Sequence, residues 1–270
     1  MATSRSFATD FLSSAIGRVL TAVLIVAAMV VAAFGAGAFG GTPVDEAAGG
    51  WLGADSTWIA PATSAFRIWS VIYLGLIAYA AWQFFRATQT PRHQRVRLWV
   101  LAGVILNSVW LFTVQAGWLA VSVLVILTLT ACLARCLVLL DEEPIGSWLE
   151  RILLDGVQGL SLGWVSIATI ANVAGWLGSL GWQGSPLTEE SWAITMAVLA
   201  TALGLALAWR FGRLTPGLAI AWGLAWVAVG RTDGSGPQSV PVAVATAVAA
   251  AIILAGSLAG VLRRRRARSS

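Results

Sequence analysis

Few residues in this chain have side chains suited to covalent or metal chemistry. The 270 residues contain one histidine, His93, in an Arg-rich stretch, and two cysteines, Cys132 and Cys136, four apart in an apolar run. A lone histidine in such a loop disfavours a His-based metal site and a Ser-His-Asp triad, and two thiols leave a metal under-coordinated. We therefore expect reduced cysteines that serve packing, no catalytic residue, no metal and no enzyme activity.

Two charged residues next to apolar runs allow functional interpretations. Asp155 is the only acid inside a predicted span, and such an acid is a candidate for proton or ion movement; near a helix end it can instead reach water or pair with Arg151, which we favour. Arg67 begins an apolar helix. Its side chain either extends to the lipid headgroups, the favoured interpretation, or anchors a ligand carboxylate.

Aromatic and polar residues recur at helical spacing in three apolar runs. Trp69 and Trp110 each lie about six residues from one end of their runs, hence roughly 9 Å deep in the same layer. These groups either pack helices together, with the asparagines bonding across, or line a pocket for a largely apolar ligand. The shared faces contain Phe66, Trp69 and Tyr73; Asn107 and Trp110; and Gln158, Ser161, Val165, Ala168 and Asn172, with Trp164 nearby.

The elements that must position these residues are membrane-spanning helices. Hydrophobic residues make up 58% of the chain, charged residues 11%, and the mean hydropathy is +0.82; soluble domains carry about 25% charged residues. This composition predicts an all-α, polytopic transmembrane bundle of about eight spans and excludes a soluble enzyme. The spans are expected near 18–39, 64–85, 97–116, 118–139, 152–178, 191–209, 214–230 and 240–262. The seventh is short and could pack inside the bundle.

The arginines predict the orientation. All 17 basic residues are Arg, and 15 fall on one side of the proposed spans, from Arg5 and Arg86 to Arg268, whereas Arg67 and Arg231 fall on the other. The positive-inside rule then puts both termini in the cytoplasm. It also explains the +5 charge better than a nucleic-acid partner does. Ala36-Gly37-Ala38 leaves cleavage of the first span as a less favoured alternative.

Three motifs carry a family resemblance. Their order and spacing, over roughly residues 15 to 180, resemble the TspO/MBR family of tryptophan-rich sensory proteins, which is related to the mitochondrial translocator protein, or peripheral benzodiazepine receptor. The motifs are Trp58-Ile-Ala-Pro61 with Phe66-Arg-Ile-Trp69-Ser-Val-Ile-Tyr73, Leu106-Asn107-Ser-Val-Trp110, and Gly163-Trp164-Val165-Ser-Ile-Ala168-Thr169-Ile-Ala-Asn172.

The resemblance implies a five-helix core over 1–180 that binds tetrapyrroles and related hydrophobic ligands beneath a long outer loop. A porphyrin or haem would then be a bound ligand rather than a cofactor. Residues 181–262 would form a three-helix extension, as in a longer bacterial branch, and 263–270 a basic cytoplasmic tail. The implied ligand-binding residues are Trp58, Pro61, Phe66, Arg67, Trp69, Tyr73, Asn107, Trp110, Trp164, Ala168 and Asn172.

Several departures limit that comparison. Only Pro61 remains of the family's paired prolines, Arg67 stands near a usual proline, and no tyrosine follows Asn172, so sterol binding is not expected. We predict a sensory or binding protein of the bacterial plasma membrane. The alternative is a transporter of a small hydrophobic or anionic compound. Expected partners are membrane lipid, a hydrophobic small molecule and, in a homodimer, a second copy of the chain.

Overall fold

The structure is a computed structural model that describes residues 14–36, 40–85 and 90–269, and all regular elements in this part of the chain are helical. The main helices are α2 (Ala15–Gly35), α3 (Ile68–Trp82), α4 (Pro91–Gln115), α5 (Leu119–Glu142), α7 (Val157–Ser179), α8 (Glu189–Phe211), α9 (Thr215–Gly230) and α10 (Val240–Ser269). Short helical turns are η1 (Ala47–Gly50), η2 (Thr63–Arg67), α6 (Trp148–Glu150) and the π-helical η4 (Arg151–Gly156).

The eight predicted helices are confirmed, and seven are long and apolar enough to cross a membrane when α3 is counted with η2 and α7 with α6 and η4. The chain is therefore a multi-pass membrane protein. The exception is α9, with 16 residues, which packs against α7, α8 and α10, in agreement with the inward position considered for the seventh span. Arg5, Arg86 and the candidate cleavage site at Gly37 and Ala38 lie outside the described residues.

The third span begins earlier than predicted, and His93 does not lie in a loop. Thr90 caps α4 and Pro91 occupies its first turn, where a missing backbone N–H costs nothing. His93 is fully buried beside the rings of Tyr79 and Trp82. The prediction failed because the polar residues of this first turn are buried against partners, which hydropathy does not detect.

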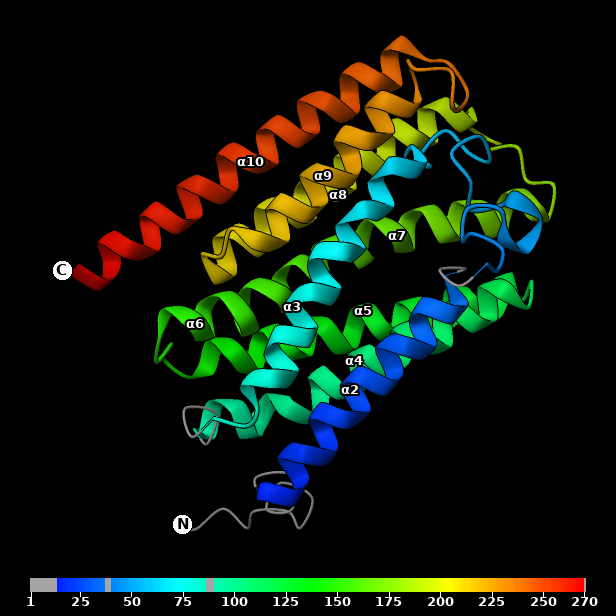
Figure 1. Cartoon of the computed structure of the whole chain (residues 1–270). Coiled ribbons are helices and arrows are strands. Elements are labelled where there is room, and N and C mark those ends of the chain that lie inside the picture. The colour runs from blue at the N-terminus through cyan, green and yellow to red at the C-terminus, as the bar shows by residue number, and fades with distance from the viewer. Residues whose placement is uncertain (1–13, 37–39, 86–89, 270) are drawn as a thin grey trace.

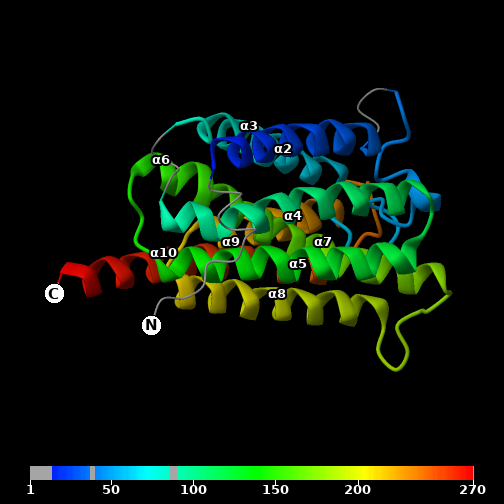
Figure 2. The same ribbon diagram turned by 90° about the horizontal axis from the view of Figure 1, so that it is seen from below.

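The helices run side by side, with their chain reversals at two ends (Figures 1 and 2). In Figure 2, α2 and α3 lie along one side and α8 along the opposite side. The first turn of α2 and the last turn of α10 lie at the same end, which we call the Arg-rich end. Its described arginines are Arg18, Arg92, Arg95, Arg97, Arg135, Arg151, Arg210, Arg213 and 263–266.

Helix α7 joins the first five helices to the last three, because it packs against both α5 and α9. The contact with α9 uses Gly159 and Gly163, a GxxxG pair. A Cβ added at Gly163 would lie 2.2 Å from the backbone oxygen of Pro216 and 2.8 Å from Cβ of Ala219. Small residues thus allow the two backbones to approach closely, as is common between helices in membranes.

A buried ion cluster at the Arg-rich end also joins the two parts. Asp155 lies 2.6 Å from Arg92 of α4 and 2.8 Å from Arg213, which precedes α9, while Arg92 also lies 2.8 Å from Glu150. Arg151 takes no part, so the predicted Arg151–Asp155 pair is wrong. Asp155 is only 3% exposed, and in that setting the guanidiniums of Arg92 and Arg213 compensate its charge better than a surface neighbour would.

Arg231, which sequence analysis treated as an isolated arginine of the outer side, is buried at the opposite end. Its guanidinium donates to the carbonyls of Thr57 and Ala54, both at 2.7 Å, and of Ala60 at 3.2 Å. Burial lowers the pKa of Arg231 to about 10, so the residue stays charged at neutral pH. The loop between α2 and α3 is therefore tied to the end of α9.

We expect Gly163→Ala to reduce thermal stability in detergent, because the new methyl group would meet a backbone oxygen that cannot rotate away. Overpacking of this kind costs about 1–3 kcal/mol. Gly103→Ala is the matched control, since its Cβ would lie 3.4 Å from the side chain of Leu133, an ordinary contact. Equal stability of the two variants would contradict the close α7–α9 packing.

Candidate ligand-binding site

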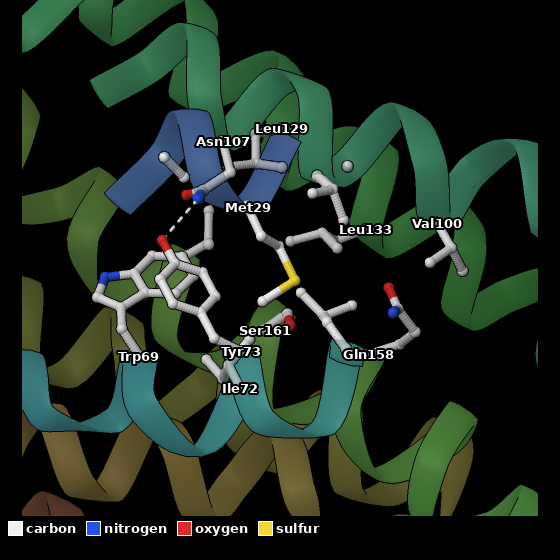
Figure 3. A pocket seen from close by; sticks show the side chains of 15 residues that line it. Met29, Trp69, Ile72, Tyr73, Val100, Asn107, Leu129, Leu133, Gln158 and Ser161 are labelled. Atoms are coloured by element: carbon white, nitrogen blue, oxygen red, sulfur yellow. Dashed lines mark hydrogen bonds between the residues drawn. The ribbon is translucent and has the colours of Figure 1, made fainter. Parts of the chain in front are cut away.

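An apolar cavity lies between α2, α3, α4, α5 and α7 (Figure 3). Its volume is about 20 Å³. The cavity in this conformation is thus nearly filled by its own side chains. Its lining residues are Met29, Ala32, Trp69, Ile72, Tyr73, Leu76, Val100, Gly103, Val104, Asn107, Leu129, Leu133, Gln158, Ser161 and Val165.

Three of the predicted ligand-binding residues line this cavity. Trp69 and Tyr73 lie four residues apart on α3, and their rings stack with centroids 5.2 Å apart and planes inclined by 28°. Asn107 of α4 donates its side-chain N–H to the Tyr73 hydroxyl at 3.0 Å, the contact drawn in Figure 3. The helical spacing read from the sequence therefore brings these side chains together.

The cavity wall retains unused hydrogen-bonding capacity. The Asn107 side-chain oxygen is buried and accepts no hydrogen bond from the described residues. The side chain of Gln158, 2% exposed, also makes no hydrogen bond within this part of the chain, and Ser161 bonds back to the Val157 carbonyl at 2.8 Å. Buried polar atoms without partners are uncommon. Two amide groups are thus available to a ligand or to water.

Trp110 and Asn172 are engaged with each other instead. The Trp110 indole N–H donates to the Asn172 side-chain oxygen at 2.7 Å, and the Asn172 amide donates to the Ser122 hydroxyl at 2.9 Å. This closed network joins α4, α5 and α7, and neither residue lines the cavity. Sequence analysis gave two interpretations of these polar residues, helix packing or a pocket. For Trp110 and Asn172 the hydrogen bonds between helices agree with the first.

Trp164 and Phe66 lie behind the stacked pair rather than on the cavity surface. The Trp164 ring, 1% exposed, meets Phe66 edge-on at 5.7 Å and Trp69 at 6.5 Å. Its indole N–H has no acceptor among the described residues. Trp164 therefore supports the orientation of Trp69 by contact.

Trp58 and Pro61 lie in the loop between α2 and α3, on the side of the last three helices. Trp58 packs beside Ile59 against Ala193, Val227 and a residue of α10, and Pro61 is buried. The loop thus rests on α8, α9 and α10, which the resemblance to a five-helix core did not foresee. Sequence analysis missed the role of Arg231. A single arginine beside an apolar run gave no sign that its side chain would be buried.

The remaining predicted residues lie away from the cavity. Arg67 is exposed on η2 and forms no ion pair within the described residues, and Ala168 is half-buried on α7. Conversely, the ligand-binding residues predicted from the sequence did not include Met29, Gln158 and Ser161, which line the cavity. The polar stripe of the fifth span contained the last two, whereas nothing distinguishes Met29 in the uniformly apolar first span.

Fold and cavity together define a helical integral membrane protein with an aromatic-walled pocket inside its first five helices. The chain matches the model of the TSPO-like protein family over residues 18–259 and therefore belongs to this family. The match continues through the last three helices. No curated protein and no solved structure matches the chain. Among the described residues, no group of three or more His, Cys, Asp or Glu side chains could hold a metal ion.

We expect Asn172→Leu to lower stability by about 1–3 kcal/mol, because it leaves the buried Trp110 N–H without an acceptor. Thermal unfolding in detergent is the measurement. Thr128→Ala on α5 is the control, since that exposed hydroxyl bonds only to its own helix at 2.8 Å. If Asn172→Leu unfolds at the same temperature as the control variant, the Trp110–Asn172 hydrogen bond does not stabilise the bundle.

Proposed function

We propose that this protein binds a planar, largely apolar ligand of the tetrapyrrole type in the cavity beside Trp69, Tyr73 and Asn107. The observation that carries the proposal is the combination of a stacked aromatic pair with the buried side-chain oxygen of Asn107, which accepts no hydrogen bond from the described residues. Aromatic surface suits a flat ring system, and a few polar groups fix its orientation. Membership of the TSPO-like family supports a binding or sensory role.

Entry of such a ligand requires the cavity to widen. Met29 of α2 is the adaptable part of the wall, because methionine is unbranched and changes conformation at low cost. Helix α2 is peripheral, with Val19, Val23 and Val30 exposed along it. We propose that the ligand displaces the Met29 side chain and separates α2 from α3.

The proposed location is a bacterial plasma membrane with the Arg-rich end in the cytoplasm. The arginine asymmetry and the common end shared by the start of α2 and the end of α10 support it. Within the described residues no observation favours transport over binding.

We expect Trp69→Leu and Asn107→Leu to weaken porphyrin binding, measured by quenching of tryptophan fluorescence in the purified protein. Loss of one stacked aromatic costs about 0.5–1.5 kcal/mol or more once its buried area is included. Trp118→Leu is the control: it removes an indole that is 62% exposed and immediately precedes α5, and this variant should bind porphyrin as the parent does. Unchanged affinity in both cavity variants, if they remain folded, would reject this site.

Arg67 should not discriminate a porphyrin dicarboxylate from its dimethyl ester. The side chain is exposed and away from the cavity, so Arg67→Gln should change the two affinities equally or not at all. A selective loss for the acid, by the roughly 1.5–3 kcal/mol of a charged hydrogen bond, would return Arg67 to the site.

The orientation is tested with reporters. A reporter fused after Arg268 should be cytoplasmic, and one inserted near Asp55 or Glu189 should be external, because the arginine excess remains inside. An external C-terminus would overturn the proposed orientation.

A further inference from the structure

A second and larger hollow lies at the Arg-rich end, outside the ligand cavity. It forms a groove between α3, η4 and the facing ends of α8, α9 and α10. The groove has a volume of about 700 Å³. Sites for drug-sized ligands hold about 300–1,000 Å³. The groove therefore has room for a ligand of this size.

One wall of the groove is apolar and exposed. Val71, Leu74 and Ala78 line it along successive turns of α3, with Val71 58% and Leu74 68% exposed. Leu214 and Val261 face them from the side of α9 and α10. In a membrane-spanning chain this wall lies at hydrocarbon depth and accommodates an alkyl chain.

The mouth of the groove is cationic. The acids of its lining already form ion pairs. Asp141 contacts Arg264 at 2.6 Å and Arg210 at 2.8 Å, and Asp155 contacts Arg92 and Arg213. Glu143, the third acid of the lining, lies 3.7 Å from Arg95.

Two arginines of the same lining have no partner among the described residues. They are Arg151 on η4 and Arg265 on α10, both exposed. Two uncompensated guanidiniums thus flank the mouth from different helices.

We propose that this groove binds an anionic phospholipid of the surrounding bilayer. Arg151 and Arg265 hold the phosphate, and an acyl chain lies along Val71, Leu74 and Ala78. The complementarity is twofold: the phosphate meets the two free cations, and the apolar wall runs from them toward the bilayer interior. Guanidinium groups bind phosphate through paired hydrogen bonds, and clustered arginines beside a span attract anionic lipid.

Such a lipid would bridge the two parts of the bundle. Arg151 and α3 belong to the first five helices, and Arg265 to the last. The site is separate from the cavity and independent of its ligand.

The test compares phosphatidylglycerol with phosphatidylcholine of identical acyl chains, each carrying a fluorophore, on delipidated protein in an uncharged detergent. The parent should bind phosphatidylglycerol about thirtyfold more tightly, since the two arginines together contribute about 2 kcal/mol. The double variant Arg151→Gln, Arg265→Gln should lose that preference. Arg135→Gln, Arg266→Gln is the matched control: it removes the same charge from the same end, at residues that do not line the groove, and should keep it.

A second pair of variants tests the apolar wall. Ala78→Trp fills the groove and should reduce phosphatidylglycerol binding at least severalfold, whereas Ile77→Trp, beside it on α3 but outside the groove, should not. Val71→Trp replaces Ala78→Trp if that variant does not fold. Porphyrin binding should persist in all of them.

Three results would overturn the proposal. One is equal binding of the two lipids by the parent, and another is equal loss in the two arginine double variants. The third is displacement of the lipid by inorganic phosphate at constant ionic strength, which would assign the mouth to a free anion.

Discussion

A buried carboxylate held between two guanidiniums is the interaction on which the arrangement of the bundle depends. Asp155 receives Arg92 from α4 and Arg213 from the turn before α9, and all three are largely buried. At low dielectric, removal of any one member leaves an uncompensated charge, which costs far more than a surface ion pair contributes. The cluster therefore fixes the distance between α4, η4 and the start of α9, and with it the position of the last three helices on α7.

At the opposite end of the bundle a buried arginine also joins the two parts, but backbone carbonyls rather than a carboxylate accept its hydrogen bonds. Arg231 donates to three carbonyls of the loop between α2 and α3, and Trp58 and Ile59 of that loop pack on α8, α9 and α10. The last three helices thus contact the first five at both ends and along α7. The family model spans both parts as well. The loop between α2 and α3 thus takes its position from the last three helices, which do not line the cavity.

Sequence analysis predicted the number of helices, their approximate bounds and the shared face of Trp69 and Tyr73, because lipid imposes a simple rule of length and polarity on each span. It failed where a polar residue is buried against a distant partner. His93, Asp155 and Arg231 all have partners far away in the sequence, and no local pattern predicts a contact of that kind. The α7–α9 contact was predicted only in part: Gly159 and Gly163 indicated a packing face but not the helix that packs against it.

The asparagines illustrate why residue type and helical position do not by themselves identify a binding residue. Asn107 and Asn172 both occupy polar stripes inside predicted spans, and both looked equally suited to a ligand. Their hydrogen bonds separate them. Asn172 accepts from Trp110 and donates to Ser122, so a ligand would have to break an existing network to use it. Asn107 donates to Tyr73 but keeps an unused acceptor at the cavity. In an interior without bulk water, a buried polar atom that remains unpaired is costly. The residue that leaves one at a cavity wall is therefore the better candidate for ligand recognition, and the one whose bonds are complete is the better candidate for holding helices together.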